Sequence, residues 1–89
     1  MSKVQIYTKN YCPYCHRAKA LLDGYGVDYV EYDLVERPEL RDEMVRRSQG
    51  GQTVPQILID GQPHGGFDDL AALDRSGALA PLLNLEPAR

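Results

Sequence analysis

Residues 4–22 read VQIYTKNYCPYCHRAKALL, an alternating segment that leads directly into a close pair of cysteines and then a helical segment. Apolar and more polar side chains alternate along residues 3–8, which is the period of a β-strand. Over residues 13–22 the apolar positions follow helical spacing instead, and Pro13 suits a first turn, where its missing N–H costs nothing. The sequence therefore predicts a strand, a helix and, at their junction, Cys12.

Glycine, proline and charge patterns divide the rest of the chain into further elements. The expected elements are a strand at 27–34 with Val30, Tyr32 and Leu34 on one face, and a helix from Pro38 to Gly50-Gly51 that buries Leu40, Met44 and Val45. They continue with strands at 56–59 and 62–64 around an Asp60-Gly61 turn, a helix capped by Asp68 or Asp69 that ends at Ser76-Gly77, and a short helix at 79–83. This order predicts an α/β fold in which one four-stranded mixed sheet, with a parallel first pair and an antiparallel hairpin, is flanked by three to four helices.

Composition limits what the chain can do. Its 89 residues suit a single domain, residues 1–89. Ten basic against thirteen acidic side chains give a net charge of −3, which argues against nucleic acid as a partner because phosphate binding relies on clustered Lys and Arg. No stretch resembles a signal-peptide core or a membrane span, so we expect a cytoplasmic protein with no membrane contact. We also expect the protein to be a monomer. Two cysteines in a reducing compartment are more often reactive or metal-binding than a structural disulfide.

The two cysteines occupy chemically unequal positions. Cys12 lies at the predicted helix start, where unpaired backbone N–H groups can donate to a thiolate. The helix dipole stabilises a negative charge at this position by about 0.3–1 kcal/mol. Lys9 adds positive charge nearby. Cys15 lies one turn into the helix, where its sulfur should face the protein. We therefore expect Cys12 to be the nucleophile and Cys15 the resolving thiol of a thiol–disulfide exchange reaction.

Other sites can be built on the same cysteine pair. A tetrahedral zinc site within the chain would need both His16 and His64, because there is no second pair of cysteines. Cys12-x-x-Cys15-His16 also has the spacing of a c-type haem attachment, which would require export and a haem-sized pocket. An inert structural pair fits poorly with a strand-to-helix junction flanked by Lys9. We expect no metal ion at this site.

Four features in order carry a family resemblance: the first strand, Cys12-Pro13-Tyr14-Cys15, Thr53-Val54-Pro55, and residues 65–70, which read GGFDDL. Together they resemble the bacterial dithiol glutaredoxins from Val4 to about Leu83. The resemblance implies a thioredoxin-like fold and an oxidoreductase with glutathione as co-substrate and no tightly bound cofactor. It also implies glutathionylated or disulfide-bearing proteins as partners, ribonucleotide reductase among the candidates.

The resemblance further implies a glutathione-binding groove. Pro55 corresponds to a cis-proline that faces the active-site sulfur and exposes the Val54 backbone for strand-like pairing. Asp68 and Asp69 correspond to the positions that hold the γ-glutamyl end. The remaining expectations are that Lys9 and Arg41 face the glycine carboxylate, that Tyr14 lines the groove, and that Thr53, Gly66 and Phe67 complete it.

Two alternative functions remain open from the sequence. Phe67 stands where many relatives carry another cysteine, and Gly-Phe there also resembles redoxins that supply ribonucleotide reductase and are reduced by thioredoxin reductase. Those proteins usually lack this Asp-Asp pair. The second alternative is a carrier that holds an iron–sulfur cluster through Cys12 and glutathione across a dimer. Such carriers usually have a single cysteine in the motif, whereas here Cys15 offers a competing disulfide.

Overall fold

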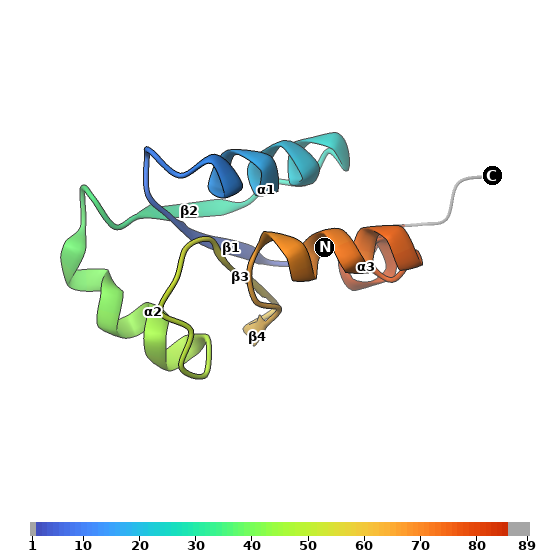
Figure 1. The fold of residues 1–89 in the computed structure, drawn as a ribbon. Coiled ribbons are helices and arrows are strands. Elements are labelled where there is room, and N and C mark those ends of the chain that lie inside the picture. Colours follow the sequence, from blue (N-terminus) through green and yellow to red (C-terminus); the bar gives the residue numbers. More distant parts are fainter. Residues whose placement is uncertain (1, 86–89) are drawn as a thin grey trace.

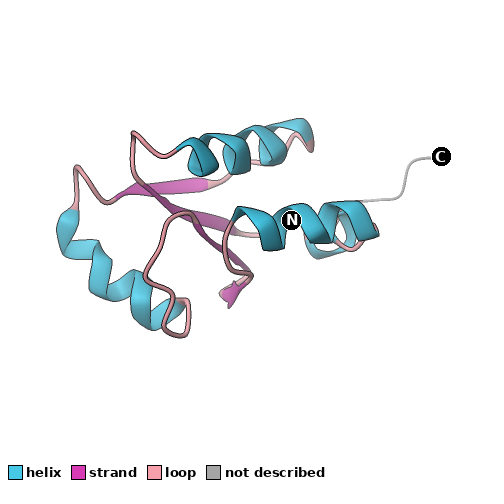
Figure 2. Cartoon of the chain, in the orientation of Figure 1, coloured by secondary structure: helices cyan, strands magenta, loops and turns pink. Residues whose placement is uncertain are grey.

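A four-stranded mixed sheet forms the centre of the computed structural model, which describes residues 2–85 (Figures 1 and 2). The strands are β1 (Val4–Thr8), β2 (Val30–Asp33), β3 (Gln56–Ile59) and β4 (Gln62–Pro63), arranged in the order β2-β1-β3-β4. The helices are α1 (Pro13–Gly24), α2 (Arg41–Arg47), α3 (Phe67–Ser76) and α4 (Leu79–Leu82), with a 3₁₀ turn, η1 (Pro38–Leu40), before α2. β1 pairs parallel with β2 and antiparallel with β3, and β3 and β4 form an antiparallel hairpin, so the predicted sheet is confirmed.

Helices cover both faces of the sheet. Val4 and Ile6 of β1 pack in a cluster with side chains of α1, α3 and α4, whereas Tyr7 packs in a second cluster with Met44 of α2. Figure 1 shows α1 and α2 on opposite sides of the strands. All five residues of β1 are buried as a result, because the strand is central and both of its faces are covered. No helix within residues 2–85 is long and apolar enough to cross a bilayer.

A buried polar network joins α2 to the sheet. The Arg47 guanidinium donates to the side-chain oxygen of Gln5 at 2.6 Å and to the Tyr7 hydroxyl at 3.1 Å. The Gln5 amide in turn donates to the Tyr32 hydroxyl at 2.9 Å. Gln5 and Tyr7 are 4% and 0% exposed, so these bonds satisfy polar atoms that water does not reach.

Two predicted elements, the second strand and the second helix, have different bounds in the structure. β2 begins at Val30 rather than residue 27, and Val30 is 46% exposed because it lies on an edge strand. The second helix starts as a 3₁₀ turn and becomes an α-helix only at Arg41, and of its predicted buried residues Met44 alone is fully buried, while Leu40 and Val45 pack around it. It ends at Arg47, because Gln49 adopts a positive φ of 59° and the Gly50 N–H closes back onto Val45 O at 2.8 Å.

The start of α3 also differs from the prediction. Gly66 is the N-cap residue, and the helix begins at Phe67, so neither aspartate is the cap. The Asp69 carboxylate instead reaches back and accepts a hydrogen bond from the Gly66 N–H at 3.2 Å. The predicted end of the helix is confirmed, since Gly77 follows it with a left-handed φ of 80°.

Candidate active site

Cys12 is the N-cap residue of α1, and its sulfur faces the free end of the helix. It has an extended backbone conformation, and its Sγ accepts a hydrogen bond from the Cys15 N–H at 3.2 Å. The Cys12 N–H donates to Lys9 O, and the Cys12 carbonyl accepts from the His16 N–H, each at 3.2 Å. The residue is partly exposed. The expected backbone donor to this sulfur is therefore present, supplied by the helix that Pro13 opens.

Cys15 lies in a different environment, one turn along the same helix. It is 0% exposed. Burial, together with a hydrogen bond to Cys12, raises the pKa of Cys15 to about 12, although the Lys9 backbone and the Lys19 ammonium both act to lower it. The predicted difference in burial between the two thiols is confirmed. A buried thiol with a raised pKa is a poor nucleophile at neutral pH, because the thiolate is the reactive form.

The Val54–Pro55 peptide lies against the first cysteine. This bond is cis, as the resemblance implied. The Cys12 thiol donates to Val54 O at 3.7 Å, and Pro55 is buried. Segments more than forty residues apart in the sequence therefore meet at the reactive sulfur.

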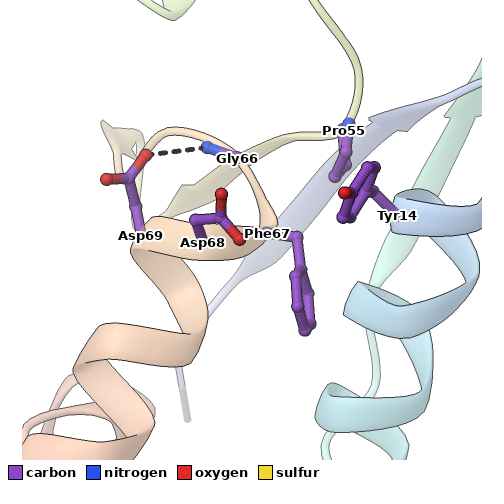
Figure 3. Close-up of a pocket in the computed structure, with 6 residues that line it drawn as sticks. All are labelled: Tyr14, Pro55, Gly66, Phe67, Asp68 and Asp69. Carbon is purple, nitrogen blue, oxygen red and sulfur yellow. Dashed lines mark hydrogen bonds between the residues drawn. The ribbon is translucent and has the colours of Figure 1, made fainter.

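A groove of about 270 Å³ opens between the start of α1 and the start of α3 (Figure 3). The residues lining it are Tyr14, Pro55, Gly66, Phe67, Asp68 and Asp69. The rings of Tyr14 and Phe67 lie 6.2 Å apart, and each projects from its helix into the space between the two. Both aspartates are exposed at the rim, and the Asp69 carboxylate is turned back to Gly66. The first turn of a helix also presents N–H groups without intrahelical partners, so this rim suits a carboxylate and an ammonium side by side.

Three residues that the resemblance assigned to the site, Lys9, Arg41 and Thr53, are not among the residues that line the groove. Arg41 is the exposed first residue of α2, and within residues 2–85 its side chain makes no hydrogen bond or ion pair with the groove lining. Thr53 is exposed and accepts hydrogen bonds from the Gln56 amide through its carbonyl and hydroxyl. Lys9 is next to the site through its carbonyl, which accepts from the Cys12 N–H. No three His, Cys, Asp or Glu side chains in the described part of the chain are placed to hold a metal ion.

One neighbour of the groove was not predicted from the sequence. The Arg17 guanidinium lies over the Tyr14 ring, 5.4 Å from its centroid. A cation at this distance is attracted to the face of the ring and restricts its movement. The signal was present in the sequence, because residues three apart on a helix are neighbours on its surface.

Comparison with known proteins agrees with the geometry of the site. A family model described as Glutaredoxin matches residues 4–64. The chain is 57% identical to Glutaredoxin 3 of Escherichia coli (strain K12) over 83 residues, which cover 93% of this chain and 99% of that protein. It is 53% identical to a glutaredoxin of Pseudomonas aeruginosa over 85 residues, which cover 94% of this chain and 99% of that one.

Solved structures of similar shape belong to the same family. A buckwheat glutaredoxin–glutathione complex matches with a TM-score of 0.84 and 30% identity, covering 93% of this chain and 77% of that one. A dithiolic glutaredoxin from Trypanosoma brucei brucei matches with a TM-score of 0.81 and 36% identity, covering 92% of this chain and 87% of the other.

Proposed function

The chain belongs to the glutaredoxin family and is a glutathione-dependent thiol–disulfide oxidoreductase, and on this premise we propose how its two cysteines divide the reaction. Cys12 is the nucleophile and Cys15 the resolving thiol. The observation that carries this assignment is the hydrogen bond from the Cys15 N–H to Cys12 Sγ at 3.2 Å, made to a partly exposed sulfur while the second sulfur stays buried. A backbone donor favours the thiolate, which is the form that attacks disulfides.

With a glutathione mixed disulfide, one cysteine is sufficient. The Cys12 thiolate attacks the glutathione sulfur, a Cys12–glutathione disulfide forms, and the substrate sulfur leaves as a thiolate that takes a proton from water. A second glutathione thiolate then attacks the glutathione sulfur of this intermediate. Glutathione disulfide departs and the Cys12 thiolate returns, held again by the Cys15 N–H.

With a protein disulfide, the second cysteine takes part. Cys12 attacks one sulfur of the substrate and forms a mixed disulfide, and Cys15 then attacks Cys12 Sγ. The products are the Cys12–Cys15 disulfide and the reduced substrate. Two glutathione molecules restore the dithiol and are oxidised to glutathione disulfide. Because the two cysteines are three residues apart at a helix start, this closure needs little backbone movement.

The groove supports a division of roles between the two aspartates. Asp69 is engaged by the Gly66 N–H, so it stabilises the start of α3. Asp68 is exposed in the groove lining and is the carboxylate available to the ammonium of the γ-glutamyl end. The N–H groups of the first turn of α3 suit the neighbouring carboxylate. Tyr14 and Pro55 form the apolar wall near the cysteinyl part, and Lys9 is the candidate cation for the glycine carboxylate.

A glutathione mixed-disulfide reduction assay, coupled to glutathione reductase, tests the assignment of the two thiols. Cys12→Ser should abolish turnover, whereas Cys15→Ser should retain most of the mixed-disulfide activity and lose reduction of protein disulfides. Equal loss from both substitutions would contradict the unequal roles. Replacing glutathione and its reductase by thioredoxin reductase in the same assay identifies the preferred electron source.

The substrates and compartment belong to the same proposal. Glutathionylated and disulfide-bearing proteins of the cytoplasm fit a partly exposed Cys12 on an open groove, and ribonucleotide reductase is one candidate among them. Pull-down with Cys15→Ser, which cannot release a protein trapped on Cys12, would identify them. Recovery of substrate only with the wild-type protein would contradict trapping through Cys12.

A further inference from the structure

A polar cluster outside the groove joins α1 to both strands beneath it. The Lys19 ammonium donates to the Glu31 carboxylate at 3.0 Å, and the Thr8 hydroxyl donates to the same oxygen at 2.6 Å. Thr8 is 0% exposed, and the Lys19 and Glu31 side chains are 22% and 33% exposed. The Lys19 side chain is therefore held in place by two strands instead of moving freely in solvent.

Its position on α1 directs this cation toward the buried cysteine. Lys19 follows Cys15 by four residues, so the two lie on the same face of the helix with Cβ atoms about 5–6 Å apart. Long side chains on a helix lean back toward its N-terminus and cover the preceding turn. For Lys19, that turn is the one that carries Cys15.

We propose that Lys19 is a positioning residue for the second half of the dithiol reaction, with its ammonium stabilising the negative charge on Cys15 when that sulfur attacks Cys12. The inference rests on the proposed role of Cys15 as the resolving thiol. In this step the Cys15 thiol gives its proton to water, its sulfur bonds to Cys12 Sγ, and the substrate sulfur leaves with the electron pair of the broken bond. Glu31 and Thr8 fix the cation where this charge develops.

The electrostatics of the cluster agree with this role. Burial raises the pKa of Cys15 to about 12, so its thiolate is scarce at neutral pH and any nearby positive charge counts. The hydrogen bond to Glu31 raises the pKa of Lys19, which keeps it charged over the working range. The titratable groups that act on this pair are Cys12, which precedes α1, Tyr29, which precedes β2, and Glu31 of β2, and the Lys9 backbone also lies beside Cys15.

Stopped-flow reaction with an aromatic disulfide that releases a coloured thiolate separates the two steps. Attack by Cys12 releases the first equivalent at a rate that depends on reagent concentration. Attack by Cys15 releases the second equivalent at a rate that does not. Suppose that loss of the Lys19 ammonium reduces the fraction of Cys15 present as thiolate tenfold. The remaining thiolate is more basic and therefore more nucleophilic, so the net slowing of its attack is about threefold. Lys19→Met should therefore slow the second phase at least about threefold relative to the first and shift its pH profile upward.

Three further variants make the outcome specific. Lys19→Arg keeps the charge and should restore the second phase, whereas Lys19→Gln keeps a donor for Glu31 without the charge and should remain slow. Lys3→Met removes an exposed lysine elsewhere and should resemble the wild type. An unchanged second phase in Lys19→Met, an equal slowing of both phases, or full rescue by Lys19→Gln would overturn the inference. A second phase that survives in Cys15→Ser would instead refute the role of Cys15 itself.

Discussion

Replacing Arg47 by Met tests the polar network that joins α2 to the sheet. The substitution removes two hydrogen bonds from a charged donor, to Gln5 at 2.6 Å and to Tyr7 at 3.1 Å. Bonds of this kind contribute about 1.5–3 kcal/mol each, and both acceptors lie in a part of the core that water does not reach. Water can reach the partly exposed Arg47 side chain, and its 3.8 Å contact with Glu43 is worth little, so we expect a total loss of about 2–4 kcal/mol.

Urea unfolding followed by far-UV circular dichroism measures this loss. For a domain of this size the midpoint should fall by roughly 1–2 M, and the thermal midpoint by roughly 10–20 °C. Arg46→Met is the matched control, because Arg46 is the exposed neighbour on the same helix, and it should change the stability by less than about 0.5 kcal/mol. A loss below that value for Arg47→Met, or equal losses for the two variants, would refute the idea that these two bonds hold α2 in place.

Two further predictions concern the groove and the buried ionisable groups. Asp68→Ala should raise the KM for glutathione several-fold and leave the thermal midpoint unchanged. Asp69→Ala should instead lower the stability by about 1 kcal/mol, because it removes the acceptor of the Gly66 N–H. The opposite pattern would exchange the roles of the two aspartates. Burial raises the folded-state pKa values of Cys15 and Tyr7, so unfolding at high pH releases protons. In reducing buffer, the stability that these two groups contribute should therefore be constant below the ordinary Cys pKa of 9.0 and should fall as the pH rises toward about 12. Thermal unfolding from about pH 7 to pH 11 checks this, and Cys15→Ser should show a smaller decline; a decline of equal size in both proteins would remove Cys15 from the explanation.

Local patterns in the sequence predicted the parts of the site that depend on neighbouring residues. The helix start at Pro13, the N-cap position of Cys12 and the burial of Cys15 follow from spacing along one short segment. The cis conformation of Pro55 did not follow from any such pattern and was expected only from the family resemblance.

Contacts between distant segments could not be predicted in the same way. Lys19, Glu31 and Thr8 lie on α1, β2 and β1, and their side chains meet only because the parallel β1–β2 pairing places both strands beneath the helix. Each residue alone has the character of an ordinary surface or strand residue. Arg41 was assigned to the groove by the resemblance alone, and it stays a prediction; in the structure it is the exposed first residue of α2 and is not among the residues lining the groove.

The two-residue strand β4 affects how readily the protein aggregates at high concentration. A sheet edge with open backbone groups can act as a template for a strand from another molecule, which is one route to fibres. Pro63 supplies no N–H at this edge, and the strand is too short to form more than a few backbone hydrogen bonds with an incoming segment. At the opposite rim, the four-residue strand β2 carries Glu31 and Asp33, and a short edge strand with charged side chains pairs poorly with another molecule. Both edge strands therefore disfavour extension of the sheet from one molecule into the next.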